Sequence, residues 1–266
     1  MRTYFYLYII AICALFASCE EVIDIDLNEA DPRLVIEAQL SDLGTEQRIR
    51  VSRTVAFTES INSRPVEDAL VTVTDNRGRV FNFDYEENGY YVNRNFRPVA
   101  TRSYDLLVNV EGERYESSCE MPPYVEVDSV GVLEETIFGD NYYFATFKFQ
   151  DPANVANYYK YDMSINSAAF RFASALNDRF NDGLYVTHQV SDQNTDIVPG
   201  DSVVVRRYCV DRRVYEYWNE FQSTNPGTAA PGNPTSNISN NALGYFSVAS
   251  VKEFGIRVPD IILREE

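Results

Sequence analysis

The sequence contains very little histidine, tryptophan and lysine. Its 266 residues include one histidine, His188, one tryptophan and three lysines. A catalytic triad or a Cys-His pair would have to use His188, and a zinc site built from several histidines is excluded. His188 lies in a predicted strand and is interpreted as a structural or surface residue. The net charge of −17 also leaves no general basic surface of the kind that nucleic-acid binding requires.

Motifs for phosphate binding and nucleophilic catalysis are missing as well. The chain has no phosphate-binding glycine loop and no Gly-x-Ser-x-Gly elbow. Asp24, Asp26 and Asn28 begin like a calcium loop, but Glu29 and Val35 occupy the positions that need Gly and Glu. Carboxylates for a glycosidase are numerous, yet no motif singles out a pair. We therefore expect a non-enzymatic protein with no cofactor and no metal site.

The N-terminus carries the one long apolar run of the chain. An apolar stretch from Tyr4 to Ala14 follows Arg2 and is shorter than the roughly 20 residues that a transmembrane helix needs. Ala17-Ser18 and then Cys19 come next, an order that resembles the lipobox of bacterial lipoproteins. Residues 1–18 are therefore predicted to be a signal peptide, and Cys19 to carry acyl chains that anchor the protein on a membrane. An ordinary secretory signal with an incidental cysteine is the alternative.

An acidic segment, residues 19–33, begins at the predicted anchor. Between Glu20 and Asp31 there are six acidic residues and no basic one. Like charges so near a membrane predict a solvated tether that keeps the folded part away from an anionic surface. Glu20-Glu21 also resemble the surface-export signal of lipoproteins in the Bacteroidota.

Period-two alternation dominates from Leu34 onward. The segments "LVIEAQL", "ALVTVTD" and "YDLLVNV" all alternate, and Asn88-Gly89 and Glu111-Gly112 predict tight turns between strands. The fold class is therefore mainly β. Residues 34–122 predict an immunoglobulin-like or transthyretin-like antiparallel β-sandwich that ends near Met121-Pro122-Pro123.

Residues 123–266 predict a second β-rich domain with one or two short helices. A helix over 211–223 is indicated by Asp211 as N-cap and by the helical spacing of Val214 and Trp218. The segment "AAFRFASALNDRF", residues 168–180, predicts a further short helix, because its apolar residues also fall on one helical stripe.

Several segments together carry a family resemblance. They are "RLVIEAQLSD", "VEDALVTVTDNRG", "YDLLVNVEGERYESSCEMPP", "PGDSVVVRRYCVDRRVYEYWNEF" and "NPTSNISNNALGYFSVAS". This succession resembles the DUF4249 family of Bacteroidota lipoproteins, although Asn241 stands where a Gly is usual. The resemblance implies an accessory lipoprotein of an outer-membrane TonB-dependent transporter, which helps cargo capture or entry. It also implies a lipid anchor in the outer membrane and exposure at the cell surface, with the periplasmic face as the alternative.

Cys119 and Cys209 are the cysteines that remain beyond the anchor. An exported compartment permits a disulfide between them, which would staple the two predicted domains together. Buried free thiols are common and are the favoured alternative.

Two short sequences resemble the Asp-Ser/Thr-apolar sites at which Bacteroidota O-glycosylate exported proteins. They are Asp128-Ser129-Val130 and Asp201-Ser202-Val203. Ser129 and Ser202 are therefore candidate glycosylation sites.

A partner interface is predicted around the loop 225–241 and the residues that follow it. Long loops carry function more often than strands, and large aromatic residues anchor interfaces, so Leu243, Tyr245 and Phe246 are the candidate contacts. The alternative is that these three residues close the core of the second domain.

A second function hypothesis is a free-standing adhesion or glycan-binding lipoprotein. It relies on the tyrosine pairs 90–91, 142–143 and 158–159, since aromatic rings stack on sugar faces. Alternation along a strand predicts instead that one ring of each pair is buried.

Overall fold

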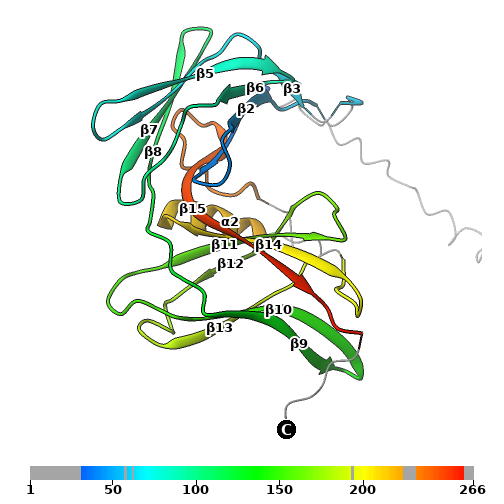
Figure 1. The fold of residues 1–266 in the computed structure, drawn as a ribbon. Coiled ribbons are helices and arrows are strands. Elements are labelled where there is room, and N and C mark those ends of the chain that lie inside the picture. Colours follow the sequence, from blue (N-terminus) through cyan, green and yellow to red (C-terminus); the bar gives the residue numbers. More distant parts are fainter. Residues whose placement is uncertain (1–30, 57–58, 62, 193–194, 224–231, 261–266) are drawn as a thin grey trace, which may run out of the picture. The chain divides into compact units, whose positions relative to one another are not determined.

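Strands make up most of the fold (Figure 1). The computed structural model describes residues 31–56, 59–61, 63–192, 195–223 and 232–260, and those from Pro32 onward belong to one unit. Within these ranges α2 (Arg212–Ser223) is the one helix, and no described helix is long and apolar enough to cross a bilayer. The prediction of a mainly β fold is confirmed.

The first eight strands fold over on themselves as a sandwich. They are β1 (Leu34–Ser41), β2 (Gln47–Arg53), β3 (Arg64–Pro65), β4 (Leu70–Asp75), β5 (Val80–Glu87), β6 (Tyr90–Asn93), β7 (Ser103–Val110) and β8 (Glu113–Glu120). β5 turns the corner between the layers, because its first half pairs with β4 and its second half with β6. The sequence-predicted turns Asn88-Gly89 and Glu111-Gly112 join β5 to β6 and β7 to β8.

The later strands extend the same sheet and add a small second one. They are β9 (Ser129–Ile137), β10 (Asp140–Gln150), β11 (Tyr158–Ile165), β12 (Arg171–Asn177), β13 (Tyr185–Val190), β14 (Ser202–Val210) and β15 (Leu243–Arg257). The large sheet has the strand order β12-β11-β14-β15-β1-β2-β6-β5-β4-β7-β8, and the small sheet has the order β13-β10-β9.

β15 runs through both halves of the large sheet. Its first part pairs in parallel with β1, from Leu243 opposite Val35 to Ala249 opposite Ser41. Its second part pairs antiparallel with β14, ending with Arg257 opposite Ser202. A single strand therefore connects the first sandwich to the later strands.

Gly244 allows β15 to lie against β1. It has φ +87°, and a Cβ added to it would lie 2.1 Å from the backbone oxygen of Ile36. Any side chain here would therefore strain the backbone and clash with β1. This explains the glycine in the Ala242-Leu243-Gly244 sequence.

Two hydrophobic cores lie on either side of this connection. The first core is made of buried residues of β1–β8 together with Phe96, Met121, Tyr208, Val210, Val214, Ile238, Ala242, Tyr245, Phe246, Val248, Ala249 and Val251, among others. The second core contains Val125, Ala145, Phe147, Phe149, Tyr159, Tyr161, Met163, Ala173, Val186, Val190, Ile197, Val203, Val205, Cys209, Ile256 and Val258. A division at residue 122 therefore leaves the first core incomplete, because α2 and β15 supply part of it.

The helix predicted for residues 168–180 is wrong. Residues Arg171–Asn177 form β12, which pairs antiparallel with β11. The apolar residues of this segment fit both periods, and pairing with an available strand edge decides for the strand. By contrast, the helix predicted from Asp211 is present as α2, and the Asp211 carboxylate accepts a hydrogen bond from Val214 N at 2.9 Å.

Candidate functional site

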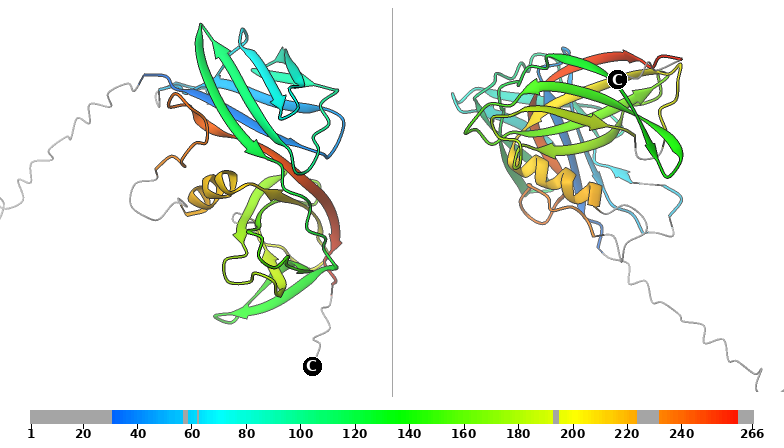
Figure 2. Two further views of the ribbon diagram at one scale, coloured as in Figure 1. Left: turned by 90° about the vertical axis from the view of Figure 1, so that its left-hand side faces the viewer. Right: turned by 90° about the horizontal axis from the view of Figure 1, so that it is seen from below.

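The segment 232–242 lies between α2 and the start of β1 (Figure 2, left, orange). Ser239 N donates to Glu116 O at 2.8 Å, and Glu116 N donates to Ser239 Oγ at 2.8 Å. These bonds cover the free edge of β8, an edge that would otherwise be open to pairing with another chain. Asn237 adds a bond from its Nδ2 to Phe246 O at 2.8 Å. The segment is therefore fastened to β8 and β15.

A hollow of about 500 Å³, here called the α2 hollow, opens between this segment, α2 and β8. Ten of its eleven lining residues have polar side chains, Ile238 being the exception: they are Glu116, Ser117, Ser118, Arg213, Glu216, Glu220 and residues 235–239. Glu220 also holds the segment in place, because its Oε2 accepts a hydrogen bond from Thr235 N at 2.6 Å. The sequence predicted a functional loop here, but not that β8 would form the opposite wall.

A second hollow of about 310 Å³, here called the N-terminal hollow, borders the same segment. Arg33 lines it and donates from Nη2 to Asn241 O at 2.7 Å and to Asn241 Oδ1 at 2.9 Å. Asn241 has φ +57°, a conformation that Asn adopts more easily than most residues. Its side chain therefore accounts for Asn at this position, because glycine could not bind Arg33 through Oδ1.

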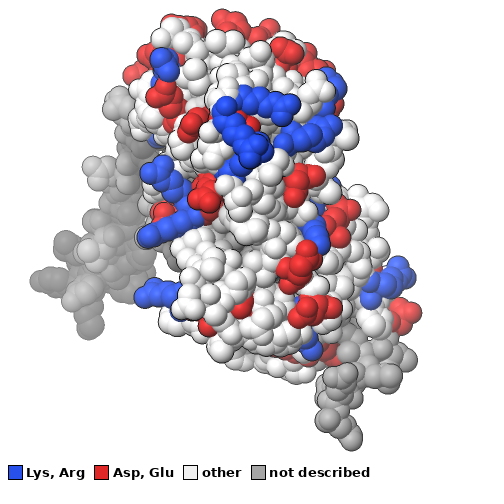
Figure 3. Space-filling view, turned by 60° about the vertical axis from the view of Figure 1, so that its left-hand side comes forward, with Lys and Arg blue, Asp and Glu red and all other residues white. Residues whose placement is uncertain are grey.

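The charges around the α2 hollow are only loosely paired. Glu116 Oε1 lies 2.6 Å from Arg114 Nη2, and Glu216 Oε1 lies 2.8 Å from Arg212 Nε. All four side chains are about half exposed or more. Exposed ion pairs contribute little to stability, so these carboxylates can exchange partners at small cost. Figure 3 shows that basic groups also lie among the acidic ones on the surface, including a cluster over the first sandwich.

Two of the three predicted interface residues are buried. Tyr245 is 8% exposed and Phe246 is 0% exposed, and both belong to the first core. The Tyr245 hydroxyl donates to Gln39 Oε1 at 2.8 Å. Neither ring can anchor a partner, so the prediction is corrected: these aromatics close the first core. Leu243 is half-buried and lines the N-terminal hollow.

Cys119 and Cys209 are both free and buried. Cys119 belongs to the first core and Cys209 to the second, so the disulfide considered from the sequence is not formed. Cys119 Sγ accepts a hydrogen bond from Val248 N at 3.2 Å, and Cys209 Sγ accepts one from Val125 N at 3.4 Å. Burial raises the pKa of both thiols, which keeps them protonated and unreactive.

The candidate modification sites differ in accessibility. Ser129 and Ser202 are both exposed and begin β9 and β14. Ser129 has exposed neighbours on either side, whereas Asp201 and Val203 are buried. A glycosylating enzyme that acts on the folded chain would reach Ser129 more easily. The predicted anchor, Cys19, lies outside the described residues.

His188, interpreted from the sequence as a structural or surface residue, is a buried structural residue. It is 6% exposed, and its Nδ1 lies 2.8 Å from the Tyr161 hydroxyl. Burial, assisted by the charge of Arg207, lowers the pKa of His188 to about 3. At neutral pH the ring is therefore uncharged and packed among Phe149, Tyr159 and Tyr161.

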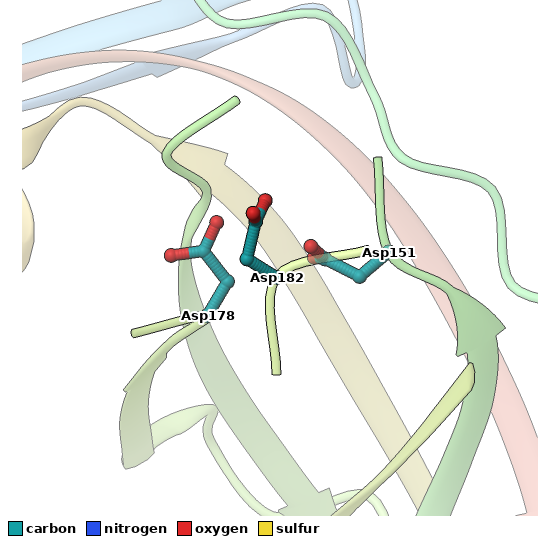
Figure 4. Close-up of side chains that lie close together, drawn as sticks. All are labelled: Asp151, Asp178 and Asp182. Carbon is teal, nitrogen blue, oxygen red and sulfur yellow. The ribbon is translucent and has the colours of Figure 1, made fainter. Parts of the chain in front are cut away.

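Three carboxylates that the sequence did not single out lie close together: Asp151, Asp178 and Asp182 (Figure 4). Their oxygens already accept hydrogen bonds from the backbone: Asp151 from Gly183 N at 3.2 Å, Asp178 from Asn157 N at 2.7 Å and Asp182 from Asn154 N at 2.8 Å. Burial raises the pKa of Asp151, and the charges of the other two add to the effect. The cluster ties the loop after β10 to the loop before β13.

The tyrosine pairs considered for sugar binding differ in exposure, and Tyr142 is the exposed member of its pair. Tyr91 and Tyr159 are 1% exposed, so two of the three tyrosine pairs have one fully buried ring. Trp218 stacks on Phe172 with ring centroids 4.6 Å apart, and Lys160 Nζ lies 4.5 Å from the Trp218 centroid. Trp218 therefore has no open face on which a sugar could stack.

The comparisons with known proteins give a family. A family model described as "Domain of unknown function (DUF4249)" matches residues 20–254. No curated protein matches the chain. The matched region includes β1 to β14, α2, the segment 232–242 and most of β15. Because the model covers most of the sequence, the chain belongs to the DUF4249 family.

Proposed function

We propose that this protein is a non-enzymatic lipoprotein of the outer membrane, anchored through Cys19 and exposed at the cell surface. It acts as an accessory subunit of a TonB-dependent transporter and helps the capture or entry of cargo. The contact with the transporter is made by the segment 232–242 and the two hollows beside it.

The observation that carries the proposal is the bond between Arg33 and Asn241. Arg33 is the last residue of the acidic tether. Its Nη2 donates to Asn241 O at 2.7 Å and to Asn241 Oδ1 at 2.9 Å. The hollows therefore lie where the chain leaves the folded part toward Cys19. The stretch from Cys19 to Arg33 spans at most roughly 50 Å when fully extended.

Confinement of this kind strengthens a weak interface. Two partners that share one membrane meet at a high effective concentration, so the contact between them need not be large. The polar side chains that line the α2 hollow, and its exposed glutamates above all, suit a contact with hydrogen-bond donors and basic groups of the transporter.

The buried titratable groups support a non-enzymatic role. His188 is uncharged and enclosed by rings, and the thiols of Cys119 and Cys209 are buried with raised pKa values. A general base must reach the proton that it removes. These groups instead complete the two cores.

Purification of the tagged full-length chain from detergent-solubilised outer membrane tests the proposal. We expect a TonB-dependent receptor to co-purify, as identified and quantified by mass spectrometry. The double variant Glu116→Lys/Glu216→Lys should lower the amount of receptor recovered at least tenfold. Its melting temperature should equal that of the wild type. The matched control is Glu87→Lys on β5, another exposed glutamate, which should leave recovery unchanged.

Two results would overturn the proposal. One is a wild-type preparation from which no such receptor can be recovered. The other is a Cys19→Ser variant that stays in the membrane fraction after a high-salt wash, which would remove the lipid anchor from the argument.

A further inference from the structure

The hairpin of β9 and β10 has an unusual residue in its turn. Phe138 and Gly139 form a two-residue connection, with φ +53° and +99°. Turns with positive φ at both central residues favour Asn-Gly or Asp-Gly, because other side chains are strained in that conformation. A phenylalanine in the first position therefore costs stability.

The same chain builds this turn twice more with polar residues. Asn88-Gly89 joins β5 to β6 with φ +52° and +79°, and Glu111-Gly112 joins β7 to β8 with φ +54° and +87°. The φ values are similar in all three turns. Folding of the third hairpin therefore does not require an aromatic residue at position 138.

Phe138 also contributes nothing to packing. Its relative exposure is 105%, which means that no other side chain covers it. Ile137 and Tyr142, next to the turn, are 37% and 36% exposed. The hairpin end projects from the small sheet (Figure 2, right), so these residues form an apolar tip that is open to solvent.

The charged residues within the end of this hairpin all have one sign. Residues 133–144 contain Glu134, Glu135 and Asp140 and no basic residue. An anionic lipid surface would repel such a tip. A protein surface with basic residues around an apolar pocket would attract it and take up the ring.

We propose that Phe138 is the anchor of a docking site for a partner protein that offers an apolar pocket with a basic rim. Large aromatic side chains that enter a pocket contribute much of the binding energy of an interface, and the three carboxylates complement the rim. This site lies on the small sheet, apart from the two hollows, and does not depend on the proposed contact with a transporter.

The decisive variant is Phe138→Asn, because it gives the turn the Asn-Gly sequence that this conformation favours. We expect its melting temperature to equal or exceed that of the wild type, while binding to the partner weakens at least tenfold. Phe180→Asn is the matched control, since Phe180 is also highly exposed, at 82%, in a different loop. Glu134→Gln/Glu135→Gln leaves the turn unchanged and should reduce the salt dependence of binding.

The partner is found by placing a photo-crosslinking amino acid at position 138 of the full chain in cells and identifying the cross-linked peptide by mass spectrometry. The proposal predicts a cross-link to a protein residue near Lys or Arg, and a dissociation constant, measured with that purified protein, that rises for Phe138→Asn and not for Phe180→Asn. Cross-links only to lipid, only to a second copy of this chain, or to nothing would overturn it. Unchanged binding by Phe138→Asn would overturn it equally.

Discussion

The two cores of the protein share β15 but bury different chemistry. In the first core, buried tyrosines bond to nearby backbone groups: the Tyr91 hydroxyl donates to Val66 O at 3.0 Å and accepts from Ala69 N at 2.8 Å. In the second core, the guanidinium of Arg207 is fully buried among rings, 4.3 Å from the centroid of Tyr159 and 4.4 Å from that of Phe149. The second core therefore encloses a cation among aromatic rings.

Arg207 has no carboxylate partner among the described residues. Its Nε donates to the Tyr161 hydroxyl at 3.0 Å and its Nη1 to Val125 O at 2.6 Å, while Nη2 has no hydrogen-bond partner there. Because Tyr161 accepts from Arg207, its own proton is available to His188 Nδ1. Aromatic faces thus take the role that a counter-ion usually has.

A second buried cation, Lys160, is stabilised differently. Its Nζ lies 2.7 Å from Asp162 Oδ2 and donates to Gln39 Oε1 at 3.0 Å. Burial lowers the pKa of Lys160, and the charge of Asp162 opposes that change. A buried ion pair of this kind tends to specify one arrangement rather than add stability; here the arrangement joins β11 to β1.

The largest expected effect distinguishes the two ends of β15. Gly244→Ala should lower the free energy of unfolding by about 3 kcal/mol or more, because the added Cβ would meet the backbone of β1 at a positive φ. Gly255→Ala should change the free energy of unfolding by no more than about 1 kcal/mol, since nothing lies within 4 Å of its added Cβ. Urea unfolding measures both; equal losses would contradict the role given to Gly244.

Removal of the Tyr161 hydroxyl tests how the buried charge of Arg207 is stabilised in the second core. Tyr161→Phe should cost about 1–3 kcal/mol of unfolding free energy, because Arg207 Nε loses its acceptor in a buried site. Adding Arg207→Met should recover much of the loss, since it removes the buried charge and keeps an apolar volume. A double variant that is less stable than Tyr161→Phe would show that the guanidinium itself stabilises the core.

Acid should weaken the second core through His188. The folded pKa of His188 is about 3, below the usual 6.5, so between these pH values the unfolded chain binds a proton that the folded chain does not. The free energy of unfolding is therefore unaffected by His188 above pH 6.5 and decreases as the pH falls toward 3. At pH 5 the expected loss is up to about 2 kcal/mol. Denaturant unfolding of the wild type and His188→Gln at pH 7.5 and 5 measures it. Equal pH dependence in the two proteins would mean that carboxylates alone cause the acid sensitivity.

The N-cap of α2 gives a smaller effect, because this helix packs against the first core. Val214 on this helix belongs to the first core, and Trp218 stacks on Phe172 of β12. Asp211→Ala should cost about 1 kcal/mol, because Val214 N loses its acceptor. Thermal or urea unfolding checks this value, and Asp211→Asn, which retains an acceptor oxygen, should lose less.

Thiol labelling asks whether the cores unfold separately. Cys119 reports on the first core and Cys209 on the second, and each can be labelled only after its core opens. Because β15 belongs to both, we expect the two thiols to become reactive at the same denaturant concentration. Labelling by a thiol reagent followed by peptide mass spectrometry measures each site, and two separate midpoints would contradict a single cooperative unit.

The sequence by itself determined much of the local structure. Alternation of apolar and polar residues gave β1, β4 and β7, because a strand exposes one face to solvent and buries the other. Asn88-Gly89 and Glu111-Gly112 gave the turns through their positive φ values, and Asp211 gave the start of α2. The local sequence also predicted the region of the candidate site, because the segment 232–242 overlaps the predicted loop 225–241.

Tertiary structure decided which strands pair and which residues remain exposed. Alternation tells which side chains share a face but not which strand lies beside them, so the division of β15 between β1 and β14 could not be read locally. For the same reason Phe246 became part of the first core, residues 171–177 became a strand, and Glu116–Ser118 became a wall of the α2 hollow. Long-range pairing is set by the packing of the whole core, and local sequence constrains it only weakly.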